Sequence, residues 1–358
     1  MTRSEKIMSM LSKKFFLSQY IYTEVYIDSE TGEKEFCDCL IEFGPIYIII
    51  QIKERDEETE SSHYKWFENK VVGKAKKQLK DTYKFFLDNT NTIFSKRSDL
   101  IIDRKKTLVP VIVFLNAELT EYKRVVYSKT FHQNINIFSF TDFSTMLENI
   151  VLPYDIICYL NYRSVFKETD KRKLIFDNIN EETTILGFPQ NETDYGQMFL
   201  LRTYHSEVKE RKVDERYVRF HNEIVSDLND RLKCPRTKFI EGLLFVDHVR
   251  ATEIAFNWEK FVVSVRENRF LEPFTFLKDD RIYAFFAHPN VMEEQDFQFR
   301  MLLCLVYFKY KYKSNTAHVF IFQNEKNEYY SVSLRDFDLN TEIPYEEYID
   351  TALQLFET

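Results

Sequence analysis

The stretch CDCLIEFGPIYIIIQIKE, residues 37–54, decides the fold because it contains two strands joined by a tight turn. Gly44 and Pro45 mark the turn, and apolar residues flank it on both sides, which is typical of a β-hairpin. Side chains alternate between the two faces of a strand. One face of the second strand is therefore wholly apolar and is expected to face the core: Ile46, Ile48, Ile50 and Ile52.

The opposite face of the same strand ends in two polar side chains. Gln51 and Lys53 are two residues apart, so they emerge on the same side of the sheet. A tight turn at 44–45 places Asp38 of the first strand across from this end. A carboxylate, an amide oxygen and an ammonium are therefore expected to converge on one polar spot. The two oxygens can hold Mg²⁺ and the ammonium can stabilise a phosphoryl charge beside an attacking water.

This arrangement resembles the PD-(D/E)xK nuclease superfamily, which has the restriction-endonuclease-like fold. In that family an Asp on one strand is followed on the next strand by (D/E/Q)-x-K. Here the corresponding residues are Asp38 and then Gln51-Ile52-Lys53. The likeness covers about residues 4–170 and extends to a group of uncharacterised bacterial proteins of this fold. It implies a Mg²⁺- or Mn²⁺-dependent nuclease with Asp38, Gln51 and Lys53 as its catalytic residues, such as occurs in prokaryotic defence or repair.

The resemblance also implies roles for two helices. Family members carry a Glu on a first helix, and Glu5 is the candidate to join Asp38 and Gln51 as a metal ligand. They often carry a Lys or Gln facing the site on the following helix, where KAKKQL supplies Lys74 and Gln78. Basic residues recur along that helix, and the stripe is either an ordinary solvated face or a contact for phosphates. The expected nucleic-acid contacts are Lys70, Lys74, Lys77 and Gln78.

One residue departs from the commoner family pattern. Gln51 stands where an acidic residue is more usual, which removes one negative charge from the site. The resemblance therefore leaves two functions open. The chain is a metal-dependent nuclease, or it is an inactive protein of the nuclease fold that binds nucleic acid or another protein.

The rest of the chain predicts an α/β protein with a mixed sheet flanked by helices, followed by a second α+β domain. The nuclease-like domain is expected at 1–176, a polar linker at 177–197 and the second domain at 198–358, where it would select a substrate or a partner. Helices are expected at 5–16, 64–89, 142–151, 154–167, 216–232 and 296–311. Strands are expected at 20–27, 35–43, 46–54, 107–116, 135–140, 260–268, 281–288, 317–324 and 328–336.

Composition narrows the functional classes. Hydrophobic residues make up 44% and charged residues 30%, which is typical of a soluble globular protein. The net charge of −8 argues against a general nucleic-acid coat protein, although it permits a local basic groove. No nucleotide-binding GxxxxGK motif occurs. We expect nucleic acid as the partner, with DNA favoured over RNA, and a homodimer or a protein partner bound through the second domain.

Localisation follows from the cysteines and from the apolar segments. The five cysteines are an odd number and lie mostly in apolar runs, so we expect reduced thiols in a cytoplasmic protein. Cys37 and Cys39 lack a second Cys or His pair nearby, so no zinc site is expected there. No signal peptide is visible, and the apolar run at 301–308 is too short to span a membrane.

Overall fold

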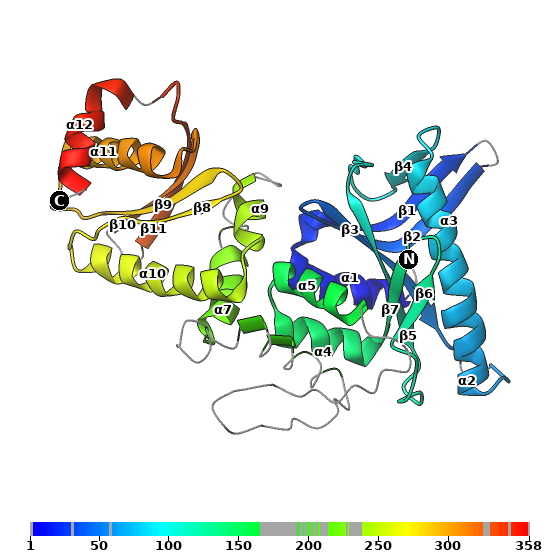
Figure 1. Ribbon diagram of the computed structural model, residues 1–358. Helices are drawn as coiled ribbons and strands as arrows, with labels where there is room; N and C mark the ends of the chain where they lie inside the picture. The colour runs from blue at the N-terminus through cyan, green and yellow to red at the C-terminus, as the bar shows by residue number, and fades with distance from the viewer. Residues whose placement is uncertain are drawn as a thin grey trace, which may run out of the picture. The chain divides into compact units, whose positions relative to one another are not determined.

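Figure 1 shows a computed structural model of the chain, which divides into two units, Met1–Val249 and Arg250–Thr358. The structure describes residues 3–29, 32–56, 59–164, 214–226, 238–324, 330–342 and 345–356, together with positions 192, 196, 199, 200, 203, 204, 207 and 228.

The first unit is built on a seven-stranded mixed sheet with the strand order β4-β1-β2-β3-β5-β7-β6. Its strands are β1 (Ile21–Ser29), β2 (Gly32–Phe43), β3 (Ile46–Glu54), β4 (Thr92–Ser95), β5 (Thr107–Leu115), β6 (Val125–Ser128) and β7 (Gln133–Ser139). The antiparallel hairpin β2–β3 is confirmed, and Gly44 in its turn has a φ of 52°. β3, β5 and β7 run parallel to one another, so β5 is a central strand as its continuous apolar run predicts.

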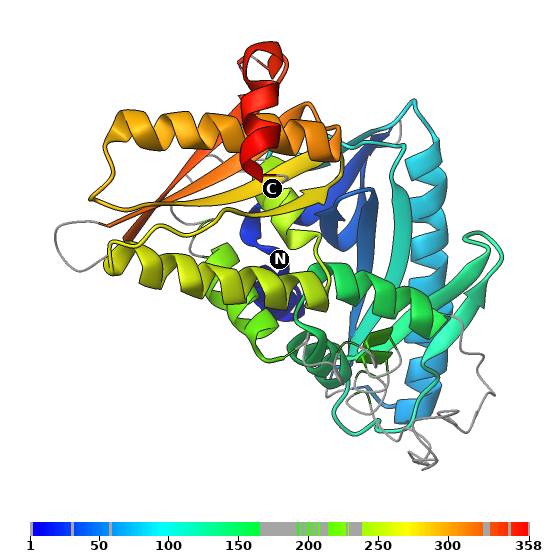
Figure 2. The ribbon, with the colours of Figure 1, turned by 60° about the vertical axis from the view of Figure 1, so that its left-hand side comes forward.

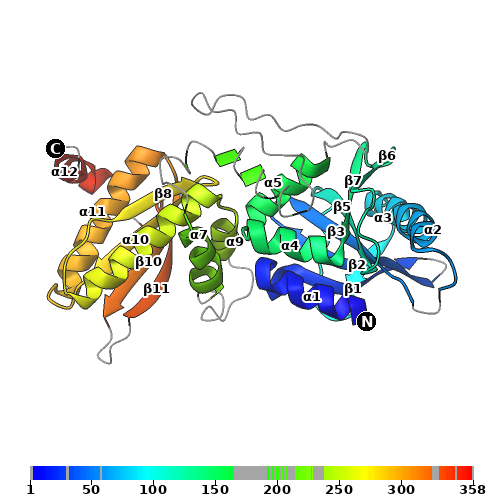
Figure 3. The ribbon, with the colours of Figure 1, turned by 90° about the horizontal axis from the view of Figure 1, so that it is seen from below.

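Helices cover both faces of this sheet (Figure 3). On one side lie α1 (Arg3–Phe16), α4 (Phe140–Ile150) and α5 (Pro153–Ser164), with the short 3₁₀ turn η1 (Ser18–Tyr20) leading into β1. On the other side one helical run consists of α2 (His63–Trp66), the π-helical segment η2 (Phe67–Ala75) and α3 (Lys76–Leu87). The unit also contains α7 (Arg216–Arg219), η3 (Phe220–Val225) and α9 (Lys238–Leu244).

The helical run 63–87 closes a large apolar cluster against β2, β3 and β5. Tyr47 and Ile49 of β3 belong to this cluster, so the second face of β3 is also buried and not only its isoleucine face. The apolar spacing of the helix expected at 64–89 predicts a core face of Val72, Ala75, Leu79, Tyr83 and Phe86, and this prediction needs a correction at Val72 and Tyr83. Its buried residues are Trp66, Phe67, Val71, Ala75, Leu79, Thr82 and Phe86, while Val72 and Tyr83 are only partly buried. The wider π-helical turn causes this shift, because it places residues four apart on one face.

The division between the units falls later in the chain than the linker predicted at 177–197. Residues 177–191 lie outside the described part, but Glu192 is fully buried and pairs with Arg163 of α5. His221 of η3 bonds the Phe15 carbonyl of α1, and His248 bonds Asp155 of α5. These buried polar contacts attach the described positions from 192 to 248 to the first unit.

The second unit has a four-stranded sheet with the order β11-β10-β9-β8. Its elements are α10 (His248–Arg266), β8 (Phe274–Lys278), β9 (Arg281–His288), α11 (Glu294–Tyr312), β10 (Thr316–Asn324), β11 (Tyr330–Asp338) and α12 (Tyr345–Phe356). Figure 2 shows the sheet between α10 and α11. The strand predicted at 260–268 is wrong, because this segment lies mostly in α10. Its apolar residues recur at helical spacing and pack as one buried face: Ala251, Ile254, Ala255, Trp258, Phe261 and Val265.

Two further expectations concern membranes and thiols. No helix in the described ranges is long and apolar enough to cross a membrane. Within those ranges the cysteines are free thiols, namely Cys37, Cys39, Cys158 and Cys304, and Cys234 lies outside them.

Candidate functional site

Three side chains predicted from the sequence meet at the end of the β2–β3 hairpin. The ammonium of Lys53 donates to Gln51 Oε1 over 3.4 Å and to the Ile52 carbonyl over 2.8 Å. The same nitrogen lies 4.0 Å from Asp38 Oδ2. The expectation that Asp38, Gln51 and Lys53 converge is therefore met by their geometry.

The strand register explains why the carboxylate sits there. The antiparallel pairs run from Phe43–Ile46 to Cys39–Ile50, which brings Asp38 next to the following residues of β3. There the Asp38 side chain accepts a hydrogen bond of 2.6 Å from the Ile52 amide. A charge that loses water needs such partners, and a backbone N–H donor to a carboxylate is among the stronger ones.

The site is largely enclosed. Gln51 is only 1% exposed, whereas Lys53 keeps 14% of its side chain exposed. Burial raises the pKa of the neighbouring Cys37 thiol, and the nearby Cys39 and the Asp38 carboxylate raise it further. Cys37 is therefore held neutral and adds no charge beside Asp38 and Lys53.

The donor set is compatible with a hard cation. A side-chain amide oxygen, a backbone carbonyl oxygen and a carboxylate oxygen surround one positive charge, the Lys53 ammonium. Magnesium is commonly held by one or two carboxylates, with waters and substrate phosphate as further ligands. Among the described residues, no group of three or more His, Cys, Asp or Glu side chains is placed to hold a metal ion. A metal here would therefore bind Asp38 and Gln51 and take its other ligands from water and substrate.

The remaining predicted residues lie on two helices. Glu5 lies in α1, but its side chain is outside the described part of the chain. Lys70, Lys74 and Gln78 each precede a buried residue of the helical run, so they share one flank of it. Lys70 and Lys74 are exposed and Gln78 is half-buried. Lys77 is exposed and lies one position farther from the buried face.

Gln78 is close to the point where α3 is anchored on β2. Thr82 Oγ donates to the Phe36 carbonyl over 2.5 Å and to the Gln78 carbonyl over 3.0 Å. Phe36 is two residues before Asp38, and Gln78 is one helical turn before Thr82. This anchor fixes the helix against the strand that carries the carboxylate, while the two lysines extend along the helix toward its N-terminal half.

Next to this site, a cavity of about 440 Å³ opens at the carboxyl ends of the parallel strands β3, β5 and β7. Its lining residues are Glu54, Arg55, His63, Phe114, Leu115, Asn116, Ala117, Glu118, Ser139, Phe140 and Thr141. Phe114 pairs with Lys53 in the parallel ladder, so the cavity begins one strand away from the lysine. The carboxyl edge of parallel strands is a common place for ligands in α/β proteins.

Sequence reasoning missed the polar residues of this cavity. His63 Nδ1 lies 3.0 Å from Asn116 Oδ1, and His63 Nε2 lies 2.7 Å from Glu118 Oε2. Arg55 donates to the carbonyls of Thr59 and Ser61 over 2.8 and 2.9 Å. Arg55 follows β3, Asn116 follows β5 and His63 begins α2, so the residues are far apart in the sequence. They come together because β3 and β5 are parallel neighbours. Recognising β3 and β5 as parallel neighbours would have been the signal for finding them.

Comparison of the chain with protein-family models, with curated proteins and with solved structures found no match.

Proposed function

We propose that the first unit is a divalent-metal-dependent nuclease of the restriction-endonuclease-like fold, acting on nucleic-acid phosphodiester bonds. One observation carries this proposal: Asp38, Gln51 and Lys53 come together at the end of β3 from a D…QxK pattern. A seven-stranded mixed sheet with helices on both faces supports it. A role in prokaryotic defence or repair stays a prediction.

In this proposal Asp38 and Gln51 hold the cation through their side-chain oxygens. A bound Mg²⁺ or Mn²⁺ supplies Lewis-acid stabilisation of the phosphoryl group and a more acidic bound water. The Lys53 ammonium then faces the scissile phosphate and stabilises the negative charge that develops on it. The Ile52 amide keeps Asp38 in its orientation through their 2.6 Å hydrogen bond.

Two features of the first unit suit a nucleic-acid strand. Lys70 and Lys74 are exposed on the flank of the helical run that also carries Gln78, where they can contact backbone phosphates. The cavity beside Lys53 offers about 440 Å³ at the carboxyl edge of β3 and β5 for a neighbouring nucleotide. DNA is the favoured substrate, and RNA is tested beside it.

The decisive experiment measures cleavage of supercoiled plasmid, linear duplex, single-stranded DNA and RNA in Mg²⁺ and in Mn²⁺. Lys53→Ala and Asp38→Ala are expected to lower the rate by about 10²–10³-fold each. The matched control is Lys106→Ala, because Lys106 is 18% exposed and bonds Glu42 over 2.8 Å near the other end of the same hairpin. Cleavage that survives both site variants, or no cleavage of any substrate, would count against the proposal.

A second candidate function is a nuclease-fold protein that binds nucleic acid or protein without cutting. The burial of Gln51 and its hydrogen bond from the Lys53 ammonium favour this function, because the ammonium already occupies the position beside the Gln51 oxygen that a metal cation would take. Thermal unfolding distinguishes the two functions. A nuclease is expected to gain stability with Mg²⁺ in the wild type and to lose that gain in Asp38→Ala. A wild type without any gain supports the binding protein.

A further inference from the structure

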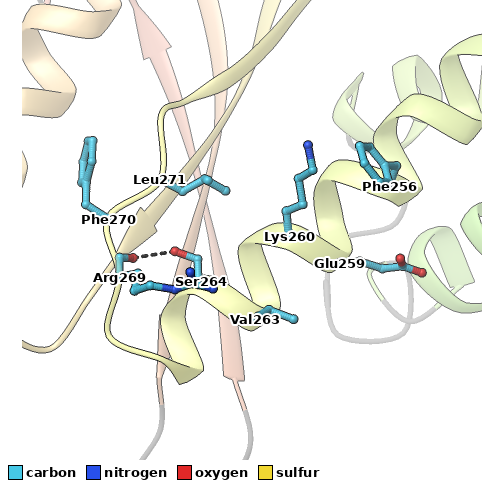
Figure 4. A pocket seen from close by; sticks show the side chains of 8 residues that line it. All are labelled: Phe256, Glu259, Lys260, Val263, Ser264, Arg269, Phe270 and Leu271. Carbon is cyan, nitrogen blue, oxygen red and sulfur yellow. Dashed lines mark hydrogen bonds between the residues drawn. The ribbon is translucent and has the colours of Figure 1, made fainter.

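A second pocket lies in the second unit, between the outer face of α10 and the segment that follows this helix. It has a volume of about 320 Å³. Its lining residues are Phe256, Glu259, Lys260, Val263, Ser264, Arg269, Phe270 and Leu271. Figure 4 shows Phe270 and Leu271 on the connecting segment and the side chains of α10 on the other side of the pocket.

The pocket exposes aromatic surface that the core of the unit does not use. Phe256 and Phe270 are 41% and 45% exposed. Phe256, Lys260 and Val263 recur at i, i+4 and i+7, so they share one face of α10. The opposite face of the helix packs Trp258 and Phe261 on the sheet.

Each of the two exposed rings has a cation beside it. Lys260 Nζ lies 4.1 Å from the centroid of Phe256, and Arg300 Cζ lies 5.2 Å from the centroid of Phe270. Arg269 adds a third cationic side chain, although it pairs with Glu267. Glu259 is the one carboxylate among the lining residues. Aromatic faces with cations beside them suit a flat ring that is attached to a negatively charged group.

The two walls of the pocket are tied together. Ser264 Oγ donates to the Arg269 carbonyl, as Figure 4 shows, and the Arg269 amide donates to the Ser264 carbonyl over 2.9 Å. Ser264 is buried, so these bonds hold the connecting segment against the end of α10. A ligand would therefore meet a preformed pocket and would lose less entropy on binding.

We propose that this pocket binds an unpaired nucleotide, with its base against Phe256 or Phe270 and its phosphate at Lys260 and Arg269. Base stacking on aromatic side chains with nearby cations is how proteins bind single strands without reading their sequence. A protein partner is less well matched, since cations interrupt the apolar surface at both rings. This inference adds to the proposed function that the substrate is single-stranded. It rests on the proposed function only in taking the bound nucleotide to be part of a nucleic-acid strand.

The first test measures binding of a fluorescent 12-nucleotide thymidine strand by anisotropy, in EDTA so that nothing is cut. Phe256→Leu and Phe270→Leu keep an apolar side chain but remove the aromatic face, and each is expected to weaken binding about tenfold. Lys260→Gln is expected to reduce the slope of log affinity against log salt by about 1. Phe299→Leu on α11 is the matched control, because Phe299 is 47% exposed and lies outside the pocket.

The source of the nucleotide is tested by competition. Three unlabelled competitors are compared for displacing the fluorescent strand: the same single strand, free thymidine monophosphate and a duplex of the same length. A strand-binding pocket predicts that the single strand competes far better than the duplex. Competition by the monophosphate alone assigns the same pocket to a free nucleotide. Equal competition by duplex and single strand, or weakening by Phe299→Leu equal to that by the pocket variants, overturns the proposal.

A second readout locates the base directly. A strand carrying 5-iodouracil is irradiated with the full-length protein, and the cross-linked peptides are identified by mass spectrometry. Cross-links at Phe256 or Phe270 are expected. Cross-links confined to the first unit, or no binding of the strand at all, overturn the proposal and leave the pocket to a protein partner. If the strand cross-links to the pocket of a protein that cleaves no substrate, the nuclease proposal fails and the nucleotide-binding proposal stands. The failure of one proposal can therefore be told from the failure of the other.

Discussion

The Lys53 ammonium lies 4.0 Å from the Asp38 carboxylate, across two antiparallel strands whose adjoining residues are buried. Both side chains are held by further hydrogen bonds, because Asp38 also accepts from the Ile52 amide and Lys53 also donates to Gln51. Such an enclosed pair contributes little net stability, since desolvation of both charges offsets their attraction. The proposed function gives the arrangement another reason, because the Asp38 and Gln51 oxygens would hold a cation and the Lys53 ammonium would face a phosphate.

The first prediction concerns Gln51→Glu, which restores the commoner acidic residue. In the absence of metal, the enclosed second carboxylate shares one ammonium with Asp38, so the variant should unfold more easily by about 1–3 kcal/mol. With Mg²⁺ the extra negative charge should strengthen metal binding, so the gain in melting temperature should exceed that of the wild type. Thermal unfolding with and without Mg²⁺ measures both effects.

The control for this variant is Gln133→Glu at the start of β7. Gln133 is partly buried, whereas Gln51 is fully buried, and the Gln133 side chain donates only weakly to the Leu108 carbonyl over 3.5 Å. The same charge change there should bring no gain from Mg²⁺. If Gln51→Glu is destabilised and responds to Mg²⁺ no better than Gln133→Glu, the site does not hold a metal.

The hairpin and its polar end could be predicted because they depend on local patterns. Gly44-Pro45 fixes the turn, strand alternation fixes the face, and the two together fix which residue of β2 lies near Lys53. The helix around Ala75 and Leu79 could be predicted in position but not in phase. Its π-helical turn has no clear signal in the residues, and it moves burial from Val72 to Val71.

Long-range packing could not be predicted in the same way. The segment 260–268 has β-branched valines that favour a strand, but Trp258 and Phe261 pack on the sheet only if the segment is helical. The polar stretch at 177–197 resembles a linker by composition, yet Glu192 within it is buried against Arg163. Only the folded partner explains why that carboxylate is needed.

The second prediction concerns Gly44→Ala. Gly44 has a φ of 52°, where a Cβ atom costs about 1–2 kcal/mol. A Cβ atom there would also lie 2.6 Å from a ring carbon of Phe245, which stacks on Phe43. The variant should therefore lose at least that much stability in urea unfolding. Gly44→Ala combined with Phe245→Leu should lose less than the sum of the two single changes, and simple additivity would show that the close approach is not felt.

The third prediction tests whether residue 192 belongs to the first unit. Glu192 accepts from Arg163 Nε over 3.1 Å, and it also accepts from Tyr159 and Arg124. Burial is the largest single influence on Arg163 and lowers its pKa, but the Glu192 carboxylate together with Tyr159 and Tyr122 raises it by more, so the net shift of the Arg163 pKa is upward. Glu192→Gln keeps the shape and leaves a buried guanidinium without its counter-charge. It should cost about 3–5 kcal/mol in urea unfolding.

The control for Glu192 is an exposed carboxylate with a similar partner. Glu223 pairs with Arg219 over 2.7 Å, one helical turn away, and both side chains are exposed. Glu223→Gln should cost less than about 1 kcal/mol. Equal losses for the two variants would mean that the segment containing Glu192 is not packed as a buried part of the first unit.

The last prediction concerns pH and His221, which is 1% exposed and lies 2.6 Å through Nε2 from the Phe15 carbonyl. Burial lowers the pKa of His221 below its ordinary value of 6.5, although the bonds to Phe15 and Asn222 oppose that shift. The unfolded chain therefore takes up a proton at a higher pH than the folded chain does. Stability from this group is complete above pH 6.5 and is lost as pH falls from there toward the lowered pKa.

His221→Gln tests this, because its amide can still donate to Phe15 but does not titrate. Melting temperatures of wild type and variant are compared between pH 4.5 and pH 8, with His132→Gln as the control at an exposed histidine. The wild type should lose stability relative to His221→Gln below about pH 6.5, at up to about 1.4 kcal/mol per pH unit. His132→Gln should follow the wild type. Parallel curves for all three proteins would mean that His221 takes up its proton equally in both states, and the link between η3 and α1 would then not depend on a neutral imidazole.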